Sequence, residues 1–212
     1  MKKILTAGTF LLILDAMVFP RNLWSFSASY DQKISSNNQT IATFFIQIKD
    51  AKMRAESKTP GFDQVVVRND SGYYNYSPVT KQGIKLPPQM QRRNLADDIP
   101  QYMEFLKRNN ATQIGSATVD DFETDIYQFE DPQGLGTTSV WLWREKNFPL
   151  KIEVKGQGGL TVVELFNVQV DVPLDDAIFE LPPDVKISEL APTVPTPQAP
   201  VKPTAPTEVK TP

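Results

Sequence analysis

The stretch TSVWLWREKNFPLKIEVKGQGGLTVVELFNVQVDVPLDDAIFELPPDVKI, residues 138–187, decides the fold of this chain. It contains three successive β-strand patterns that end in a segment punctuated by Pro and Asp. In the first strand Trp141 and Trp143 alternate with Val140 and Leu142, so apolar side chains point to both faces. We therefore expect an antiparallel sheet that is covered on each side, with a core on one face and a core or a cavity on the other.

The sequence upstream of this stretch is also mostly β. Segments of alternating polar and apolar residues recur there, and turn residues such as Asp70, Ser71 and Gly72 separate them. The total is about ten strands at the regular spacing of an all-β barrel or a curved sheet. We predict strands over residues 40–48, 51–57, 63–69, 72–79, 83–87, 111–119, 122–130, 137–145, 148–154 and 160–170.

One interval, residues 94–110, breaks the β pattern. Ile99, Tyr102, Met103 and Leu106 recur at helical spacing, acidic residues precede them, and basic residues follow, as the helix dipole favours. The sequence therefore predicts a single amphipathic helix. One helix across the mouth of a long antiparallel sheet fits a sheet that curls into an incomplete barrel and encloses an apolar pocket. The expected fold class is mainly β (α+β).

The two ends of the chain differ from this central part. Residues 1–29 have a basic start, an apolar run and small residues, which is typical of an export signal. We expect cleavage after Ser27 or Ser29, or retention as an uncleaved anchor, and a periplasmic location. Residues 190–212 are almost wholly Pro, Thr, Ala, Val and Lys, a composition that predicts a disordered, extended tail. The folded domain is then residues 30–189.

The composition excludes several classes of function. The 212 residues include no Cys and no His, which removes disulfides, Cys/His zinc sites and the commonest general base. A formal net charge of -3 gives no general attraction to nucleic acid. Carboxylate pairs such as Asp120 and Asp121 fit solvated turns, and a carboxylate glycosidase is the remaining enzymatic alternative. We expect a non-enzymatic protein without metal or cofactor.

Two motifs and the order of the segments resemble a known superfamily. The motifs are the W-x-W strand followed by FPLKIEV and the ending NVQVDVPLDDAIFELPPDVK. Over residues 40–187 the chain resembles the outer-membrane lipoprotein carrier (LolA-like) superfamily. The resemblance implies an open half-barrel that binds acyl chains of lipoproteins or lipids beneath a helical cap and transfers them without catalysis. Residues 29–39 depart from the pattern, because carriers usually have an amphipathic helix there and this segment is short and polar.

The resemblance also implies a latch for the cap. By motif position, Arg54 matches an arginine that contacts the cap in the family, and the alternative is a strand arginine paired with a neighbouring carboxylate. The rest of the expected pocket lining is apolar, and each of its residues could equally be ordinary core. The predicted ligand-binding residues are Phe44, Ile46, Ile48, Arg54, Val65, Val67, Tyr74, Tyr76, Ile99, Met103, Leu106, Trp141 and Trp143.

Two hypotheses for the function follow. The first is a monomeric carrier of lipid or lipoprotein acyl chains that works with an envelope protein as donor or acceptor. The second is a structural or sensory envelope module that has no ligand and binds another protein through its β surface or its tail. A continuous apolar cavity beneath the helix would favour the carrier, and a packed interior would favour the protein-binding module.

Overall fold

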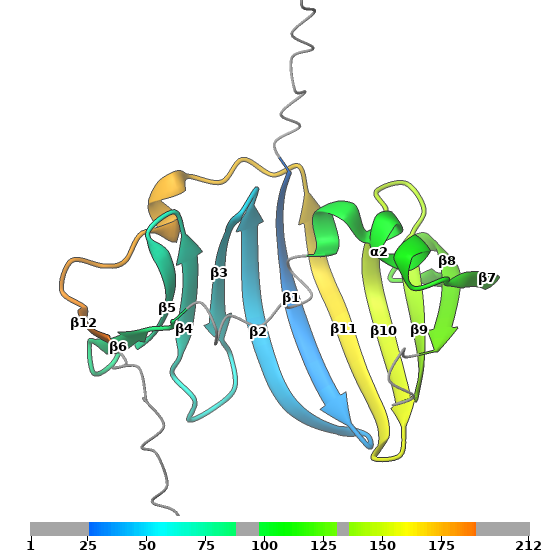
Figure 1. Ribbon diagram of the computed structural model, residues 1–212, viewed down its shortest axis with the longest axis horizontal. Coiled ribbons are helices and arrows are strands. Elements are labelled where there is room, and N and C mark those ends of the chain that lie inside the picture. The colour runs from blue at the N-terminus through cyan, green and yellow to red at the C-terminus, as the bar shows by residue number, and fades with distance from the viewer. Residues whose placement is uncertain (1–25, 88–97, 131–135, 190–212) are drawn as a thin grey trace, which may run out of the picture.

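The computed structural model describes residues 26–87, 98–130 and 136–189. Twelve strands in these residues form one open sheet in the order β12-β6-β5-β4-β3-β2-β1-β11-β10-β9-β8-β7, which is antiparallel except for the β12-β6 pair (Figure 1). The strands are β1 (Ser27–Ser36), β2 (Gln39–Lys49), β3 (Lys52–Ser57), β4 (Val65–Asn69), β5 (Gly72–Ser77), β6 (Gln82–Lys85), β7 (Thr112–Val119), β8 (Phe122–Glu130), β9 (Gly136–Trp143), β10 (Phe148–Gly156), β11 (Gly159–Val170) and β12 (Lys186–Glu189).

One short helical segment covers one face of this sheet. The 3-10 turn η2 (Ile99–Gln101) leads into helix α2 (Tyr102–Arg108), and Figure 1 shows α2 in front of the end of the sheet that contains β8 to β11. Pro100 stands in the first turn, where its missing N–H costs nothing, and the N–H of Asn109 bonds back to the last turn. The predicted fold class, an incomplete barrel with one capping helix, is confirmed.

Parts of the predicted organisation lie outside the described residues. These are residues 1–25 of the expected export signal, the first four residues of the expected helix and the Pro-rich tail. Within the described part of the chain, no helix is long and apolar enough to span a membrane.

The central strand β1 was not predicted. It pairs with β2 on one side and with β11 on the other, so it joins the two halves of the sheet. Ala28 and Tyr30 have no exposed surface, and they share a face with Gln32 and Ile34. Most other residues of β1 are polar, so the alternation of Ala28, Tyr30 and Ile34 is weak in the sequence. Cleavage of the expected export signal after Ser29 would remove Ala28 from the strand.

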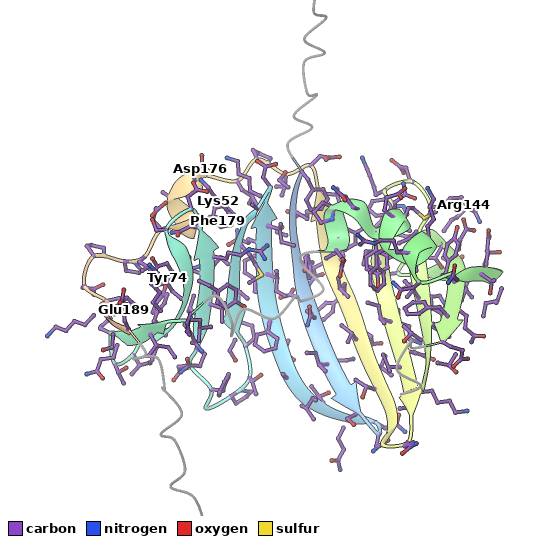
Figure 2. The ribbon with its side chains drawn as sticks, viewed as in Figure 1. Lys52, Tyr74, Arg144, Asp176, Phe179 and Glu189 are labelled. Carbon is purple, nitrogen blue, oxygen red and sulfur yellow. The ribbon has the colours of Figure 1, made fainter. Side chains whose placement is uncertain are left out.

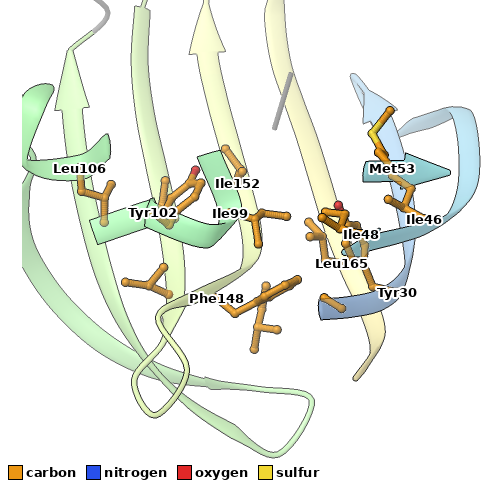
Figure 3. Packing of buried hydrophobic residues seen from close by; sticks show 14 of the residues in the cluster. Tyr30, Ile46, Ile48, Met53, Ile99, Tyr102, Leu106, Phe148, Ile152 and Leu165 are labelled. Atoms are coloured by element: carbon orange, nitrogen blue, oxygen red, sulfur yellow. The ribbon is translucent and has the colours of Figure 1, made fainter. Parts of the chain in front are cut away.

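The main apolar cluster lies between η2–α2 and the sheet, on what we call the helix face. Ile99, Tyr102 and Leu106 from the helical segment are almost fully buried there. Figure 3 shows them over side chains contributed by β1, β2, β3, β10 and β11. The labelled sheet residues are Tyr30, Ile46, Ile48, Met53, Phe148, Ile152 and Leu165.

The opposite face of the sheet is covered at its other end by residues 171–185, which we call the C-terminal strap. The strap contains the 3-10 turn η3 (Asp176–Phe179), which contacts β3 and β4. Phe179 is fully buried, and Figure 2 shows it beside Lys52 and Asp176. Val65, Val67 and Tyr76 form a second small core with two strap residues, Leu181 and Val185. We call this side of the sheet the strap face.

Replacing Phe179 with Ala should destabilise the protein by about 3 kcal/mol, because it leaves a cavity beneath the strap. Equilibrium denaturation monitored by tryptophan fluorescence measures the change in unfolding free energy. Phe62→Ala is the matched control, because Phe62 is 52% exposed and its truncation should change stability by less than about 0.5 kcal/mol. Equal losses of unfolding free energy for the two variants would show that the strap does not depend on Phe179.

Candidate functional site

The register of the sheet divides the predicted ligand-binding residues between its two faces. Ile48 on β2 stands opposite Met53 on β3, and both belong to the core of the helix face. Arg54 follows Met53 and therefore points to the other face, because neighbouring strand residues alternate. Arg54 stands opposite Val67, and Val67 stands opposite Tyr74. These residues all lie on the strap face.

The same reasoning places Trp141 away from the helix. Ile152 lies in the helix-face cluster and stands opposite Val140, so Trp141 points to the other side, where Lys151 Nζ lies 4.7 Å from its ring centroid. Trp143 stands opposite Phe148, beyond the register shift between Pro149 and Lys151, and it packs against the main apolar cluster. Its ring also stacks on Phe122, with centroids 4.4 Å apart.

The structure does not bring all the predicted lining residues together on one face. The residues on the helix face are Phe44, Ile46, Ile48, Ile99, Met103 and Leu106, and Trp143 packs against the same apolar cluster. The residues on the opposite face are Arg54, Val65, Val67, Tyr74, Tyr76 and Trp141.

Arg54 latches the strap rather than the helix. Its Nη1 donates to the carbonyl oxygen of Ile178 at 3.3 Å, and its Nε donates to the Glu56 carboxylate at 2.8 Å. Asn69 adds a second anchor, since its Nδ2 donates to the carbonyl oxygen of Phe179 at 3.0 Å. Arg54 was predicted to contact the helical cap, and in the structure it contacts the strap and Glu56 instead.

The interior beneath the helix is packed. Ile99 and Tyr102 are each 3% exposed and Leu106 is 1% exposed. The ring of Phe105 contacts Phe129 edge-on, with centroids 5.8 Å apart. Open hollows lie elsewhere on the described surface, such as one of about 590 Å³ lined by residues of β5, β6 and β12, including Asn75.

One polar group at the helix face stands out from its apolar surroundings. The hydroxyl of Tyr30 is buried and has no hydrogen-bond partner among the residues that the structure describes, and burial raises its pKa. Its ring packs edge-on against Phe148, with centroids 5.5 Å apart, and it stands opposite Ile46. An unpaired buried hydroxyl is costly, so a polar atom of a water or a ligand that accepts its hydrogen bond would stabilise this place. The sequence analysis missed Tyr30, although its alternation with Ala28 could have signalled an inward-facing strand residue.

Several of the described carboxylates are held in ion pairs and turns. Arg144 binds Glu123 at 2.8 Å and Asp125 at 2.9 Å. Asp175 caps η3 by accepting from the N–H of Ala177 at 3.0 Å. Among the residues that the structure describes, no three His, Cys, Asp or Glu side chains are grouped so that they could hold a metal ion.

These features define a class of protein, an open half-barrel module with an apolar cluster under a short helix. No protein-family model and no curated protein matches the chain. Among solved structures, the chain is similar to an uncharacterised conserved protein from Thermus thermophilus, with a TM-score of 0.54, 13% identity, and coverage of 80% of this chain and 93% of that one. This similarity supports the fold alone.

The chain is also similar to a chain of the MucA/MucB complex from Pseudomonas aeruginosa. The TM-score is 0.51 with 13% identity, and the match covers 78% of this chain but only 59% of that one. A LolA superfamily protein from Nitrosomonas europaea matches over 74% of this chain, but its TM-score of 0.33 is too low to support an argument.

The strap should loosen in acid. Lys52 and Lys49 lie 3.1 Å and 3.3 Å from the Asp176 carboxylate and lower its pKa. A lowered pKa contributes stability that is present above the unfolded-state pKa of about 3.9 and is lost as pH falls through the folded-state value. The stability difference between wild type and Asp176→Asn should therefore be constant near neutral pH and vanish in strong acid, as measured by urea denaturation at each pH. Asp63→Asn, in an exposed loop, is the control. A difference that persists in strong acid would contradict the role given to Asp176.

Proposed function

We propose that this chain is an exported, non-catalytic protein of the cell envelope that binds an acyl chain on its helix face, beneath η2 and α2. The observation that supports this most strongly is the Tyr30 hydroxyl, which lies inside an apolar cluster and has no hydrogen-bond partner in the described part of the chain. The carbonyl oxygen of an acyl ester or amide would accept that hydrogen bond while the hydrocarbon replaces apolar contacts. Among common cell components, lipids and lipoproteins carry this combination of groups.

The helical segment is suited to being displaced by such a ligand. The Lys107 ammonium binds Glu104 at 2.7 Å and Asn109 Nδ2 donates to the carbonyl of Phe105 at 2.8 Å, so these polar contacts stay within the segment. Lifting the segment would expose three large side chains, at a cost of roughly 5 to 9 kcal/mol. A chain of about 14 methylenes gains roughly 11 kcal/mol on burial. The small surplus gives an affinity low enough for release, as a carrier requires.

The export signal expected at residues 1–29 and the LolA-like motifs support a place in the envelope. In this role the protein would receive its ligand from one envelope protein or membrane and pass it to another.

A second candidate is a protein-binding envelope module with no lipid ligand. The packed interior beneath the helix favours it, and so does the fold shared with a chain of the MucA/MucB complex. The two candidates differ in whether the helix face opens.

The substitution Tyr30→Phe distinguishes the acyl-binding function from the protein-binding module. Loss of an unpaired buried hydroxyl should raise the unfolding free energy of the empty protein by about 1 kcal/mol. Loss of the hydrogen bond to the ligand should weaken acyl binding roughly threefold to tenfold. Fluorescence displacement with palmitate and with a diacylated lipopeptide measures the affinity, and denaturation measures the stability. Tyr76→Phe is the control for the affinity measurement, because Tyr76 is also buried but lies on the strap face, where its hydroxyl bonds to Arg54.

Each result has a distinct meaning. A wild-type protein that binds neither palmitate nor lipopeptide would rule out the acyl-binding function and favour the protein-binding module. Binding that Tyr30→Phe leaves unchanged would mean that the ligand lies elsewhere on the protein.

A further inference from the structure

Two buried side-chain atoms that lack a hydrogen-bond partner among the described residues lie on the same face of the sheet. One is the hydroxyl of Tyr30, and the other is the amide oxygen of Asn75 on β5. The register joins the two residues in one row across β1 to β5. Read strand by strand, this row is Tyr30, Ile46, Ala55, Val66 and Asn75. Because Tyr30 and Ile46 belong to the helix-face cluster, Asn75 also lies on the helix face.

Asn75 lines an open hollow of about 590 Å³ at the β5, β6 and β12 end of the sheet, which we call the polar hollow. Most of its lining side chains end in amide, hydroxyl or ammonium groups, and no Asp or Glu of the described residues lines it. The lining residues that the register places on the helix face are Asn75, Ser77, Gln82, Ile84, Lys186 and Ser188.

The side chains of the polar hollow select the chemistry of its ligand. The Asn75 amide oxygen is an acceptor, so its partner must donate a hydrogen bond. A hydroxyl can donate to this oxygen and at the same time accept from the Lys186 ammonium. A cationic headgroup would also donate, but it would lie beside Lys186 in a hollow without a carboxylate, which is costly. The hollow therefore favours a ligand rich in hydroxyl groups.

The separation of Tyr30 and Asn75 sets the size of the ligand. The two residues are four strands apart in the row, which is about 19 Å along the sheet because neighbouring strands lie about 4.8 Å apart. If the acyl carbonyl binds at Tyr30, a headgroup as small as glycerol does not reach the polar hollow. A headgroup with two sugar rings is long enough, once the lengths of the Tyr30 and Asn75 side chains are included.

We propose that the polar hollow binds the sugar headgroup of a glycolipid whose acyl chain lies beneath η2 and α2. Sugar hydroxyls donate to Asn75 and accept from Lys186, while the acyl carbonyl accepts from Tyr30. Between these groups the ligand crosses Ala55 and Val66, which are partly buried beside the apolar cluster. The inference rests on the acyl-binding function and names the class of lipid that the protein binds.

Three palmitoyl esters with the same hydrocarbon chain test the proposal, namely sucrose monopalmitate, monopalmitoylglycerol and palmitoyl lysophosphatidylcholine. Displacement of a fluorescent fatty acid from the full chain measures each affinity. The sucrose ester should bind roughly tenfold more tightly than the other two, because it alone carries a hydroxylated headgroup that reaches the polar hollow. Free sucrose is the fourth probe, and it should bind far more weakly than its ester.

Two substitutions in the polar hollow should reduce this preference. Asn75→Leu removes the amide oxygen, and Lys186→Gln removes the ammonium. Each should lower the ratio of the sucrose-ester affinity to the monopalmitoylglycerol affinity roughly threefold to fivefold. Lys85→Gln is the matched control and should keep the wild-type ratio, because Lys85 stands opposite Tyr74 on the strap face. Thermal unfolding shows that each variant is folded, and Lys186 is exposed, so its replacement should leave the midpoint unchanged.

The outcomes separate this inference from the acyl-binding function. A wild-type protein that binds palmitate but binds the three esters equally would overturn the sugar site alone. A preference that both Asn75→Leu and Lys186→Gln leave intact would also overturn it. Free sucrose that binds as tightly as its ester would contradict the assignment to a lipid headgroup. Failure to bind palmitate or any ester would overturn the acyl-binding function and this inference with it.

Discussion

The pairing of β1 with both β2 and β11 is the constraint on which the rest of the structure depends. Both are long antiparallel contacts, and the contact between β1 and β11 joins strands that are far apart in the sequence. Through them the N-terminal strands β2 to β6 and the C-terminal strands β7 to β11 become one curved sheet. The same strand carries Ala28 and Tyr30 into the helix-face cluster, so loss of β1 would both divide the sheet and open its core.

Strand alternation then gives this one sheet two different coverings. At one end η2 and α2 bury a large apolar cluster on the helix face. At the other end the C-terminal strap crosses the opposite face, with Phe179 buried and Arg54 and Asn69 bonded to strap carbonyls. The strap uses polar anchors to the sheet, whereas the helical segment relies largely on apolar contacts. This difference is why we assign ligand uptake to the helix face and a structural role to the strap.

Most of the strands and the helix could be predicted from the sequence, because their apolar periodicity is strong and turn residues separate them. The faces could not be assigned, because alternation alone does not tell which face of the sheet the helix covers. In the structure Ile48 stands opposite Met53 on the helix face, so Arg54 lies on the other face. The predicted strands 40–48 and 51–57 also place Arg54 on the face away from Ile48, so the expected contact of Arg54 with the cap came from the resemblance and not from the strand pattern.

The role of Tyr30 could not be predicted for a different reason. Its segment is polar on the outer face and contains Gln32 on the inner one, so its alternation is weak in the sequence. Tertiary contacts with β2 and β11 decide the conformation of this segment. The short strand β12 is a similar case, because its four residues become a strand only beside β6.

The central claim is that an acyl chain binds between the helix and the sheet, which isotope-filtered NMR of methyl-labelled protein with unlabelled palmitate tests directly. The claim predicts nuclear Overhauser effects from the acyl methylenes to the methyl groups of Ile46 and Ile48 on the helix face. Contacts to Val65 and Val67 on the strap face instead, or no contacts at saturating palmitate, would contradict it.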